Sequence, residues 1–257
     1  MCYDIKTSLE KQLRRALLDD DSKSTTEILE KLKIFSEDDI TLHHASGFDH
    51  PNMIIYKQSD PQTPCIATWG LVPEWTIDAE SIWNKTLNAR GETLFEKPSF
   101  KDSIAQKRCI VFLEGFYEHH HKNGKTFPHF IRLADKEIFA VAGLYTQWEN
   151  YETNEPLTTF TIVTTQANGL MQKIHNNPKL KEPRMPLILD EKQQEKWLEG
   201  KWSDSAEIEA FLAPYNEKDM DAYTVAPLRG KNTVKNNPNA SQPKKYSELE
   251  VEQLDLF

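Results

Sequence analysis

Short apolar runs separated by polar turns occupy the middle of the chain. Between residues 52 and 165, seven runs have the β-branched and aromatic content that is typical of strands. They are MIIYK at 53–57, CIATWG at 65–70, CIVFL at 109–113, GFYEHHH at 115–121, FPHFIRL at 127–133, IFAVAGLY at 138–145 and FTIVTT at 160–165. Asn123-Gly124, between two of these runs, is a strong signal for a β-hairpin turn. Because neighbouring runs lie too close in sequence for helical crossovers, the pattern predicts a mostly antiparallel sheet.

Apolar residues recur with a helical period on both sides of this region. Residues 5–19 place Leu9, Leu13 and Ala16 on one face, and residues 24–36 form a rougher apolar stripe. The same period returns in three later segments, at 167–173, 190–199 and 204–212. These five segments are predicted helices.

The composition changes after residue 228. The stretch 229–247 is rich in Asn, Pro and Lys, which is typical of a loop or linker, and an acidic tail follows it. We therefore expect an α+β fold in a single domain at 1–228. This domain would be a curled, mixed but mostly antiparallel, barrel-like β-sheet with flanking helices, including an N-terminal helical decoration at 5–36. The linker and tail would occupy 229–257.

The composition is that of a folded, non-exported protein. The 257 residues include 12 Phe, 8 Tyr and 6 Trp, which argues against a disordered chain. The longest apolar run falls short of the ~18 residues that span a bilayer, and the N-terminus has no apolar signal segment, so we expect no membrane association. Three cysteines without C-x-x-C spacing fit a reducing cytoplasm.

The net charge is −9, from 31 basic and 40 acidic residues. Such a surface repels nucleic acid on average. A DNA partner would therefore have to be held by a local basic patch.

Cys2 is the first residue with distinctive chemistry. Removal of the initiator methionine is usual when the second residue is small, and it would leave a terminal cysteine whose α-amine and thiol share one residue. The pKa of an α-amine, about 7.7–8.0, leaves much of it neutral near physiological pH. Such an amine attacks an aldehyde to give an imine, which the adjacent thiol traps as a thiazolidine ring. By its position alone, Cys2 is also compatible with an incidental thiol at a frayed chain end.

A series of motifs in fixed order accompanies this cysteine. They are WGLVPEW at 69–75, NARGET at 88–93, EKPSF at 96–100, RCIVFLEGFYE at 108–118, TFTIVTTQAN at 159–168, IH at 174–175 and RMPLIL at 184–189. From Cys2 to about Asn237, the chain resembles the SOS-response-associated peptidase family. Its members are abasic-site processing proteins that crosslink themselves to abasic sites in single-stranded DNA. The resemblance implies a curled sheet with a cleft in which the terminal cysteine meets its partners.

Four positions match the family's active residues: Cys2, Asn88, Glu118 and His175. A carboxyl with a raised pKa at Glu118 would deliver the proton that opens the abasic sugar. His175 would exchange protons with the sugar or with the first adduct. Asn88, with one donor and one acceptor, would aim the terminal amine.

A second group of residues is implied to contact DNA. Arg90 shares a face with Asn88 and would clamp a phosphate, and Thr164 would add a hydrogen bond to the backbone. Trp69 and Trp75 are candidates for stacking on unpaired bases, although plain core packing is the alternative for both. The remaining candidates are Leu71 as a wedge, Lys97, Lys101, Lys107 and Arg108 as a basic patch, and Lys235 and Asn236 as residues that close the cleft.

The chain departs from the family pattern at three places. Tyr3 and Asp4 replace the usual Gly-Arg after the cysteine, which removes a basic phosphate contact and adds a carboxylate. His119 replaces a common Trp. Eight residues, NNPKLKEP, separate His175 from Arg184, where the family has one, and this insertion puts the DNA contact of Arg184 in doubt.

We expect neither a metal nor a cofactor. His119 and His121 alternate onto one strand face, but no Cys or carboxylate stands at ligand spacing beside them, which favours a solvated hairpin.

The last five residues resemble the pentapeptide that binds the bacterial sliding clamp. Leu256 and Phe257 would enter an apolar groove, with Gln253 as a polar latch and Leu254 between them. The alternative is that this tail docks on its own domain. Tethering to the clamp would raise the local concentration of the protein at stalled forks.

The sequence thus predicts a cytoplasmic protein, associated with the nucleoid during DNA damage. It would shield abasic sites in single-stranded DNA by forming a covalent thiazolidine through Cys2. Two alternatives stay open: an N-terminal-nucleophile thiol peptidase or amidohydrolase, in which Cys2 attacks an amide, and a non-catalytic adaptor bound to the sliding clamp.

Overall fold

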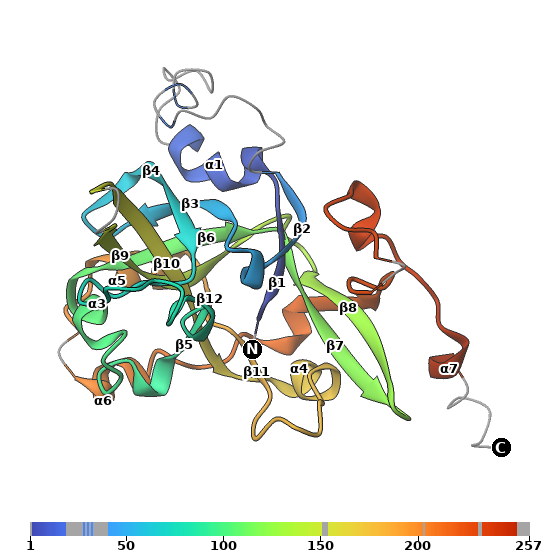
Figure 1. Ribbon diagram of the computed structural model, residues 1–257. Helices are drawn as coiled ribbons and strands as arrows, with labels where there is room; N and C mark the ends of the chain where they lie inside the picture. Colours follow the sequence, from blue (N-terminus) through green and yellow to red (C-terminus); the bar gives the residue numbers. More distant parts are fainter. Residues whose placement is uncertain are drawn as a thin grey trace.

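Two β-sheets form the framework of the protein (Figure 1). The computed structural model describes residues 2–18, 28, 30, 32, 41–150, 154–202, 204–230 and 233–250. The first sheet is antiparallel, in the order β13 (Met220–Thr224), β8 (Lys125–Leu133), β7 (Gly115–Lys122), β1 (Asp4–Thr7) and β2 (Leu42–Ser46). The second has the order β11 (Arg184–Pro186), β10 (Pro156–Gln166), β4 (Asp60–Trp69), β3 (Asn52–Lys57), β6 (Arg108–Leu113), β9 (Phe139–Glu149) and β12 (Ile188–Leu189), with β5 (Asn88–Arg90) paired to β10.

The second sheet closes on itself. β9 pairs with β10 as well as with β6, so that β10, β4, β3, β6 and β9 form a ring of five strands. β4 and β5 run parallel to β10, whereas the other pairs are antiparallel. The predicted α+β fold, with its curled and mostly antiparallel barrel-like sheet, is confirmed.

Short helices and 3-10 turns flank the two sheets. They are α1 (Leu9–Leu18), α3 (Lys101–Gln106), α4 (Gly169–Ile174), α5 (Glu191–Glu199), α6 (Ser205–Glu209) and α7 (Ser247–Glu250), together with the 3-10 turns η2 (Gly47–Asp49), η3 (Trp83–Lys85), η4 (Gly91–Thr93), η5 (Glu217–Asp219) and η6 (Pro238–Ser241). At α5, a capping box joins Asp190 and Gln193. Within the ranges described above, no helix has the length and apolarity that crossing a bilayer requires.

The barrel strands are buried on both faces. Ile54 and Tyr56 of β3 belong to a core cluster that includes residues of α1 and α5, and Met53 and Ile55 belong to a second cluster that includes Cys2. Strands covered on both faces have continuous apolar runs, which is why the sequence pattern identified them. All seven predicted runs are strands. Asn123-Gly124 is the β7–β8 turn, with φ values of 51° and 73°.

The predicted helix at 5–19 is wrong at its start. Asp4–Thr7 is strand β1, and helix α1 begins only at Leu9. Ile5 and Thr7 are fully buried, and both edges of this strand are paired, with β7 and with β2. These partners are distant in sequence, so the local apolar period could not reveal them. The predicted helix at 24–36 lies mostly outside the described residues.

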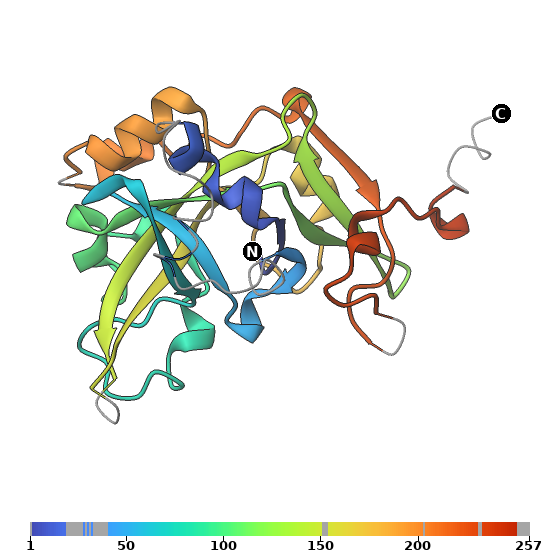
Figure 2. The ribbon, with the colours of Figure 1, turned by 90° about the horizontal axis from the view of Figure 1, so that it is seen from above.

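The stretch 229–247, predicted as a loop or linker, packs against the first sheet. Ala240 is fully buried, and the Tyr246 hydroxyl donates to the Val225 carbonyl. The Asn236 side chain accepts a hydrogen bond from the backbone N–H of His43 on β2. The side view and the view from above agree that this segment lies beside β8 (Figures 1 and 2).

Arg108 lies in the core, so its predicted place in a surface basic patch is wrong. The residue is fully buried at the start of β6. Its guanidinium donates to five backbone carbonyls, those of Ile104, Ala105, Trp197, Leu198 and Gly200. Arg108 therefore joins α3 and α5 to the barrel.

Arg108→Met would leave these buried carbonyls without a donor. We expect the free energy of unfolding to fall by roughly 3 kcal/mol or more, measured by urea denaturation. Lys107→Met is the matched control, because Lys107 is paired with the exposed Glu74 at the surface. Its loss should stay below about 1 kcal/mol. Equal losses in the two variants would contradict a structural role for Arg108.

Candidate active site

Cys2 lies two residues before β1, the strand that is paired with β7 on one edge and with β2 on the other. Asp4 pairs with Tyr117 on β7 and with Ser46 on β2. Only 1% of Cys2 is exposed, and its Sγ contacts the Asp4 carbonyl at 3.9 Å. The first residues of the chain are therefore held inside the molecule, as Figure 1 shows for the N-terminus.

Asn88 holds the backbone of Cys2. It lies on β5, whose parallel pairing with β10 places Asn88 opposite Ile162. Its Nδ2 donates to the Cys2 carbonyl at 2.7 Å. Its Oδ1 is buried and has no hydrogen-bond partner among the described residues. An open acceptor thus lies on the same amide that positions Cys2.

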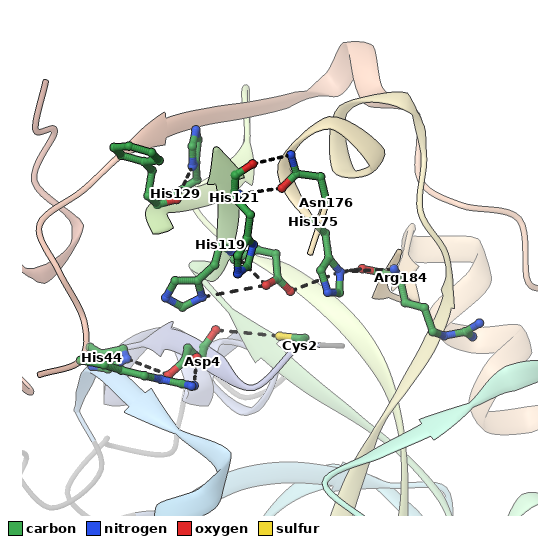
Figure 3. Close-up of polar contacts among 12 residues, drawn as sticks. Cys2, Asp4, His44, His119, His121, His129, His175, Asn176 and Arg184 are labelled. Atoms are coloured by element: carbon green, nitrogen blue, oxygen red, sulfur yellow. Dashed lines mark hydrogen bonds and ion pairs between the residues drawn. The ribbon is translucent and has the colours of Figure 1, made fainter. Parts of the chain in front are cut away.

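Glu118 and His175 contact each other, and the charge of Glu118 acts on the Cys2 thiol. Figure 3 shows the polar contacts of this region, with Cys2 and His175 labelled. Glu118 Oε2 lies 3.4 Å from His175 Nδ1, and Glu118 Oε1 accepts a hydrogen bond from the His119 backbone at 2.9 Å. Glu118 comes from β7, the direct neighbour of β1. His175 ends helix α4, and its Nδ1 also lies 3.0 Å from the Arg184 carbonyl. The fold brings all four predicted catalytic positions together.

Burial changes the proton affinity of these groups. It raises the pKa of the Glu118 carboxyl to about 7, even though the His119 N–H favours the charged form. It lowers the pKa values of His175 and His119 to about 4. It also raises the pKa of the Cys2 thiol, and the negative charge of Glu118 adds to this effect. At neutral pH, the carboxyl is thus close to half-protonated, the two imidazoles are neutral and the thiol keeps its proton.

A cleft of about 490 Å³ opens beside these residues. Glu118, His175 and Tyr3 line it, together with Asn177 and Leu180 from the insertion between His175 and Arg184. The residues on either side of the insertion stay in contact, because the His175 ring lies 3.0 Å from the Arg184 carbonyl. It therefore contributes to the cleft wall.

Asp4 connects the start of β1 to residues that the sequence motifs did not single out. His44 Nε2 lies 2.9 Å from Asp4 Oδ1, and Arg229 Nη2 donates to Asp4 Oδ2 at 2.8 Å. Burial alone would raise the pKa of Asp4, but the hydrogen bond from His44 and the charge of Arg229 outweigh it and lower the pKa. Asp4 is therefore a charged anchor. No local signal identifies Arg229, which falls at the beginning of the stretch predicted as a linker.

Four of the predicted DNA contacts are on the surface. Arg90, Lys97 and Lys235 are exposed, and 56% of Trp75 is exposed. Their roles in DNA binding stay predictions. Asn236, expected to close the cleft, instead holds β2 through the backbone N–H groups of His43 and His44.

Trp69 and Thr164 do not present their side chains to a ligand. Trp69 is fully buried, and its indole donates to the Leu87 carbonyl and stacks on Phe160. Thr164 is also fully buried, and its hydroxyl contacts the Ala89 carbonyl and Arg184. The structure places these two side chains in the packing of β4, β5 and β10 and not on the surface, where the sequence predicts that they meet DNA. Leu71 is likewise fully buried.

Arg184 is also buried, and its side chain makes hydrogen bonds within the protein. It is 2% exposed, and its guanidinium donates to Glu92 at 2.7 Å and to the Thr164 carbonyl at 2.8 Å.

In the part of the chain that the structure describes, no group of three or more His, Cys, Asp or Glu is placed to hold a metal ion. The predicted clamp-binding residues Gln253, Leu254, Leu256 and Phe257 lie outside the described residues.

The amino-acid sequence matches the family model described as SOS response associated peptidase (SRAP) over residues 1–231. The chain belongs to the SRAP family. The family resemblance predicted from the motifs is therefore confirmed, and the match includes Arg229.

Relatives with similar sequences carry a common name. The SRAP chain is 44% identical over 170 residues to "Abasic site processing protein YoqW" of Bacillus subtilis, a match that covers 66% of this chain and 71% of the relative. It is 41% identical over 170 residues to "Abasic site processing protein YoaM" of the same organism, with 66% and 70% covered. An X-ray structure of a Bacteroides thetaiotaomicron protein superposes with a TM-score of 0.79 at 33% identity, covering 95% of this chain and 100% of that one.

The raised pKa of Glu118 predicts how stability depends on pH. The folded state binds this proton more tightly than the unfolded state, since the pKa is about 7 instead of 4.5. Wild type therefore loses stability through this group as pH rises from about 4.5 to 7. Glu118→Gln removes the titration. The free energy of unfolding of Glu118→Gln minus that of wild type should rise over this window by roughly 3 kcal/mol and then level off.

Urea denaturation of both proteins between pH 4.5 and 8 measures this difference. The pKa values of His119 and His175 are lowered chiefly by burial, which the substitution preserves, so that their opposite contribution is largely shared by the two proteins. Glu96→Gln, the same chemical change at an exposed position, is the control and should give a flat difference. A flat difference for Glu118→Gln as well would contradict the raised pKa.

Proposed function

We propose that this SRAP protein acts in the DNA damage response by joining abasic sites in single-stranded DNA covalently to Cys2. The names of its Bacillus relatives support an abasic site as the target. The observation that carries the proposal is the set of contacts around Cys2: Asn88 donates to its carbonyl, the charge of Glu118 acts on its thiol, and His175 lies 3.4 Å from Glu118.

The first step forms a bond between nitrogen and carbon. A ring-opened abasic sugar carries an aldehyde at C1′. Once the initiator methionine is removed, the α-amine of Cys2 attacks C1′ and forms a C–N bond, and loss of one water gives an imine. The open Oδ1 of Asn88 is the acceptor that would orient this amine.

The second step closes the ring. Cys2 Sγ adds to C1′ of the imine and forms a C–S bond, while the thiol proton moves to the imine nitrogen. The five-membered thiazolidine results, one water is released overall, and no oxidant or reductant is consumed. Burial raises the pKa of the thiol, so the thiolate is disfavoured until the iminium cation forms beside it.

Glu118 and His175 divide the proton transfers between them. With a pKa of about 7, Glu118 can protonate the sugar ring oxygen and the departing hydroxyl, and it can then accept the thiol proton. With a pKa of about 4, His175 is neutral and can accept a hydrogen bond from a sugar hydroxyl. Glu118 Oε2 and His175 Nδ1 are 3.4 Å apart, so a proton can pass between the two side chains.

Exposed residues around the cysteine would hold the DNA strand. Arg90, whose charge acts on the half-buried Tyr3 next to Cys2, is our proposed phosphate contact. The exposed Trp75 would stack on an unpaired base. Lys97 and Lys235 would supply further positive charge to the backbone.

The same residues would suit a thiol peptidase or amidohydrolase less well. Attack of Cys2 on an amide needs a thiolate before any substrate reacts. Burial of Cys2 raises the pKa of its thiol and opposes this. The covalent DNA linkage is therefore the function that we propose.

Crosslinking to an abasic oligonucleotide tests the proposal. Incubation with uracil-containing single-stranded DNA and uracil glycosylase should give a shifted band that survives denaturant. Cys2→Ala should lose this band but form an imine that only borohydride traps, because the amine stays while the thiol is gone. Cys65→Ala, which removes a partly buried thiol elsewhere, should crosslink like wild type.

Intact-mass spectrometry of the adduct provides the chemical check. It should show loss of Met1 and a mass increase equal to the DNA minus one water. A stable adduct on a chain that retains Met1, or on Cys2→Ala, would rule out the thiazolidine.

We also propose that the tail tethers the protein to the bacterial sliding clamp, which would bring it to damaged DNA in the nucleoid. The polar and apolar pattern of Gln253, Leu254, Leu256 and Phe257 supports this. Deleting 253–257 should weaken binding to purified clamp at least tenfold, measured by calorimetry, and leave crosslinking unchanged. Glu248→Ala, on the exposed helix α7, is the control and should bind as wild type does. Undiminished clamp binding after the deletion would refute the tether.

A further inference from the structure

Arg229 reaches the wall of the cleft from the C-terminal part of the chain. It follows strand β13, which ends at Thr224, and it lines the same cleft as Glu118 and His175. Its Nη2 donates to Asp4 Oδ2 at 2.8 Å. Asp4 is two residues from Cys2, so this contact fixes a guanidinium close to the proposed nucleophile.

The two partners of this ion pair differ in exposure. The Asp4 side chain is 3% exposed, whereas the Arg229 side chain is 58% exposed. The other carboxylate oxygen of Asp4, Oδ1, lies 2.9 Å from His44 Nε2. Among the described residues, the other guanidinium nitrogens of Arg229 have no hydrogen-bond partner. One edge of the guanidinium is therefore anchored, and the rest of it faces the solvent in the cleft.

The cleft otherwise offers little positive charge. Among the described residues that line it, Arg229 is the one arginine or lysine. Three histidines, His119, His121 and His175, also line it, and burial lowers the pKa values of His119 and His175 to about 4, which leaves these two uncharged at neutral pH. A DNA strand can enter a protein of net charge −9 only where a local cation meets its phosphates.

We propose that Arg229, held in place by Asp4, binds a phosphodiester of the DNA backbone next to the abasic sugar. This inference rests on the proposed function and deepens it. An arginine clamped by a buried carboxylate loses little conformational freedom on binding, and its planar fork suits a phosphate. The carboxylate at Asp4, which stands where the family pattern has a basic residue, would thereby orient a cation toward the DNA.

Binding of an unreactive abasic analogue tests the site separately from the covalent reaction. Single-stranded DNA with a tetrahydrofuran residue has no aldehyde, so its affinity, measured by fluorescence anisotropy, reports contacts alone. Arg229→Ala should raise the Kd about tenfold. It should also lower the slope of log Kd against log salt by about 0.7, the value for one phosphate contact on a single strand. Arg229→Lys should restore the slope, because it keeps the charge.

Arg132→Ala is the matched control. Arg132 also pairs with an aspartate, Asp221, at 3.0 Å, and its side chain is 47% exposed, but it lines a different pocket. This variant should keep the affinity of wild type and its salt dependence. A second arm replaces single phosphates beside the tetrahydrofuran by neutral methylphosphonates. At one of these positions, the replacement should weaken DNA binding by wild type and leave the affinity of Arg229→Ala unchanged.

The outcomes separate this inference from the function on which it rests. An unchanged affinity and salt slope in Arg229→Ala, or an equal loss in Arg132→Ala, would overturn the phosphate site. A lower melting temperature of Arg229→Ala with an unchanged slope would assign Arg229 a structural role instead and would also overturn it. Failure of wild type to crosslink natural abasic DNA, alongside the expected Arg229 effects on the analogue, would refute the covalent function and support the site.

Discussion

The position of Cys2 depends on strand β1 being hydrogen-bonded along both of its edges. Asp4 and Ile5 pair with β7 on one side and with β2 on the other. The first residues of a chain normally fray, because few contacts repay the entropy lost on ordering them. Here two strand ladders and the complete burial of Ile5 repay it. Because Glu118 lies on β7, the same ladder that fixes the cysteine also fixes the carboxyl beside it.

The packing that orders β1 also sets the proton states of the site. Excluding water from Glu118 and His175 raises the pKa of the first and lowers the pKa of the second. A carboxyl that is close to half-protonated near pH 7 can both give and take a proton, which a solvated glutamate does poorly. The cost is a folded state that is less stable above pH 4.5 than a neutral side chain would make it. A destabilising buried group of this kind is a frequent feature of functional sites.

Sequence patterns predicted the barrel because its strands are apolar on both faces, as Ile54 and Met53 illustrate. They failed at β1, whose four residues continue into a helix and whose partners are distant. The four predicted catalytic positions came from family motifs and not from periodicity, since a glutamate on a strand and an asparagine two residues before an arginine have no distinctive local pattern. Arg108 and Thr164 are buried where the sequence predicts exposed side chains, because the sequence records their polarity but not their burial.

The sequence by itself determined seven of the strands, the family to which the chain belongs and the residue types that are available for the chemistry. These properties follow from local patterns of apolar and polar residues and from motifs of a few positions. Only the tertiary structure decided that Asp4 is bound to Arg229 across most of the length of the chain, and that Trp69 packs in the core. Such contacts depend on how distant strands pair and on which side chains lose water, and neither is a property of neighbouring residues.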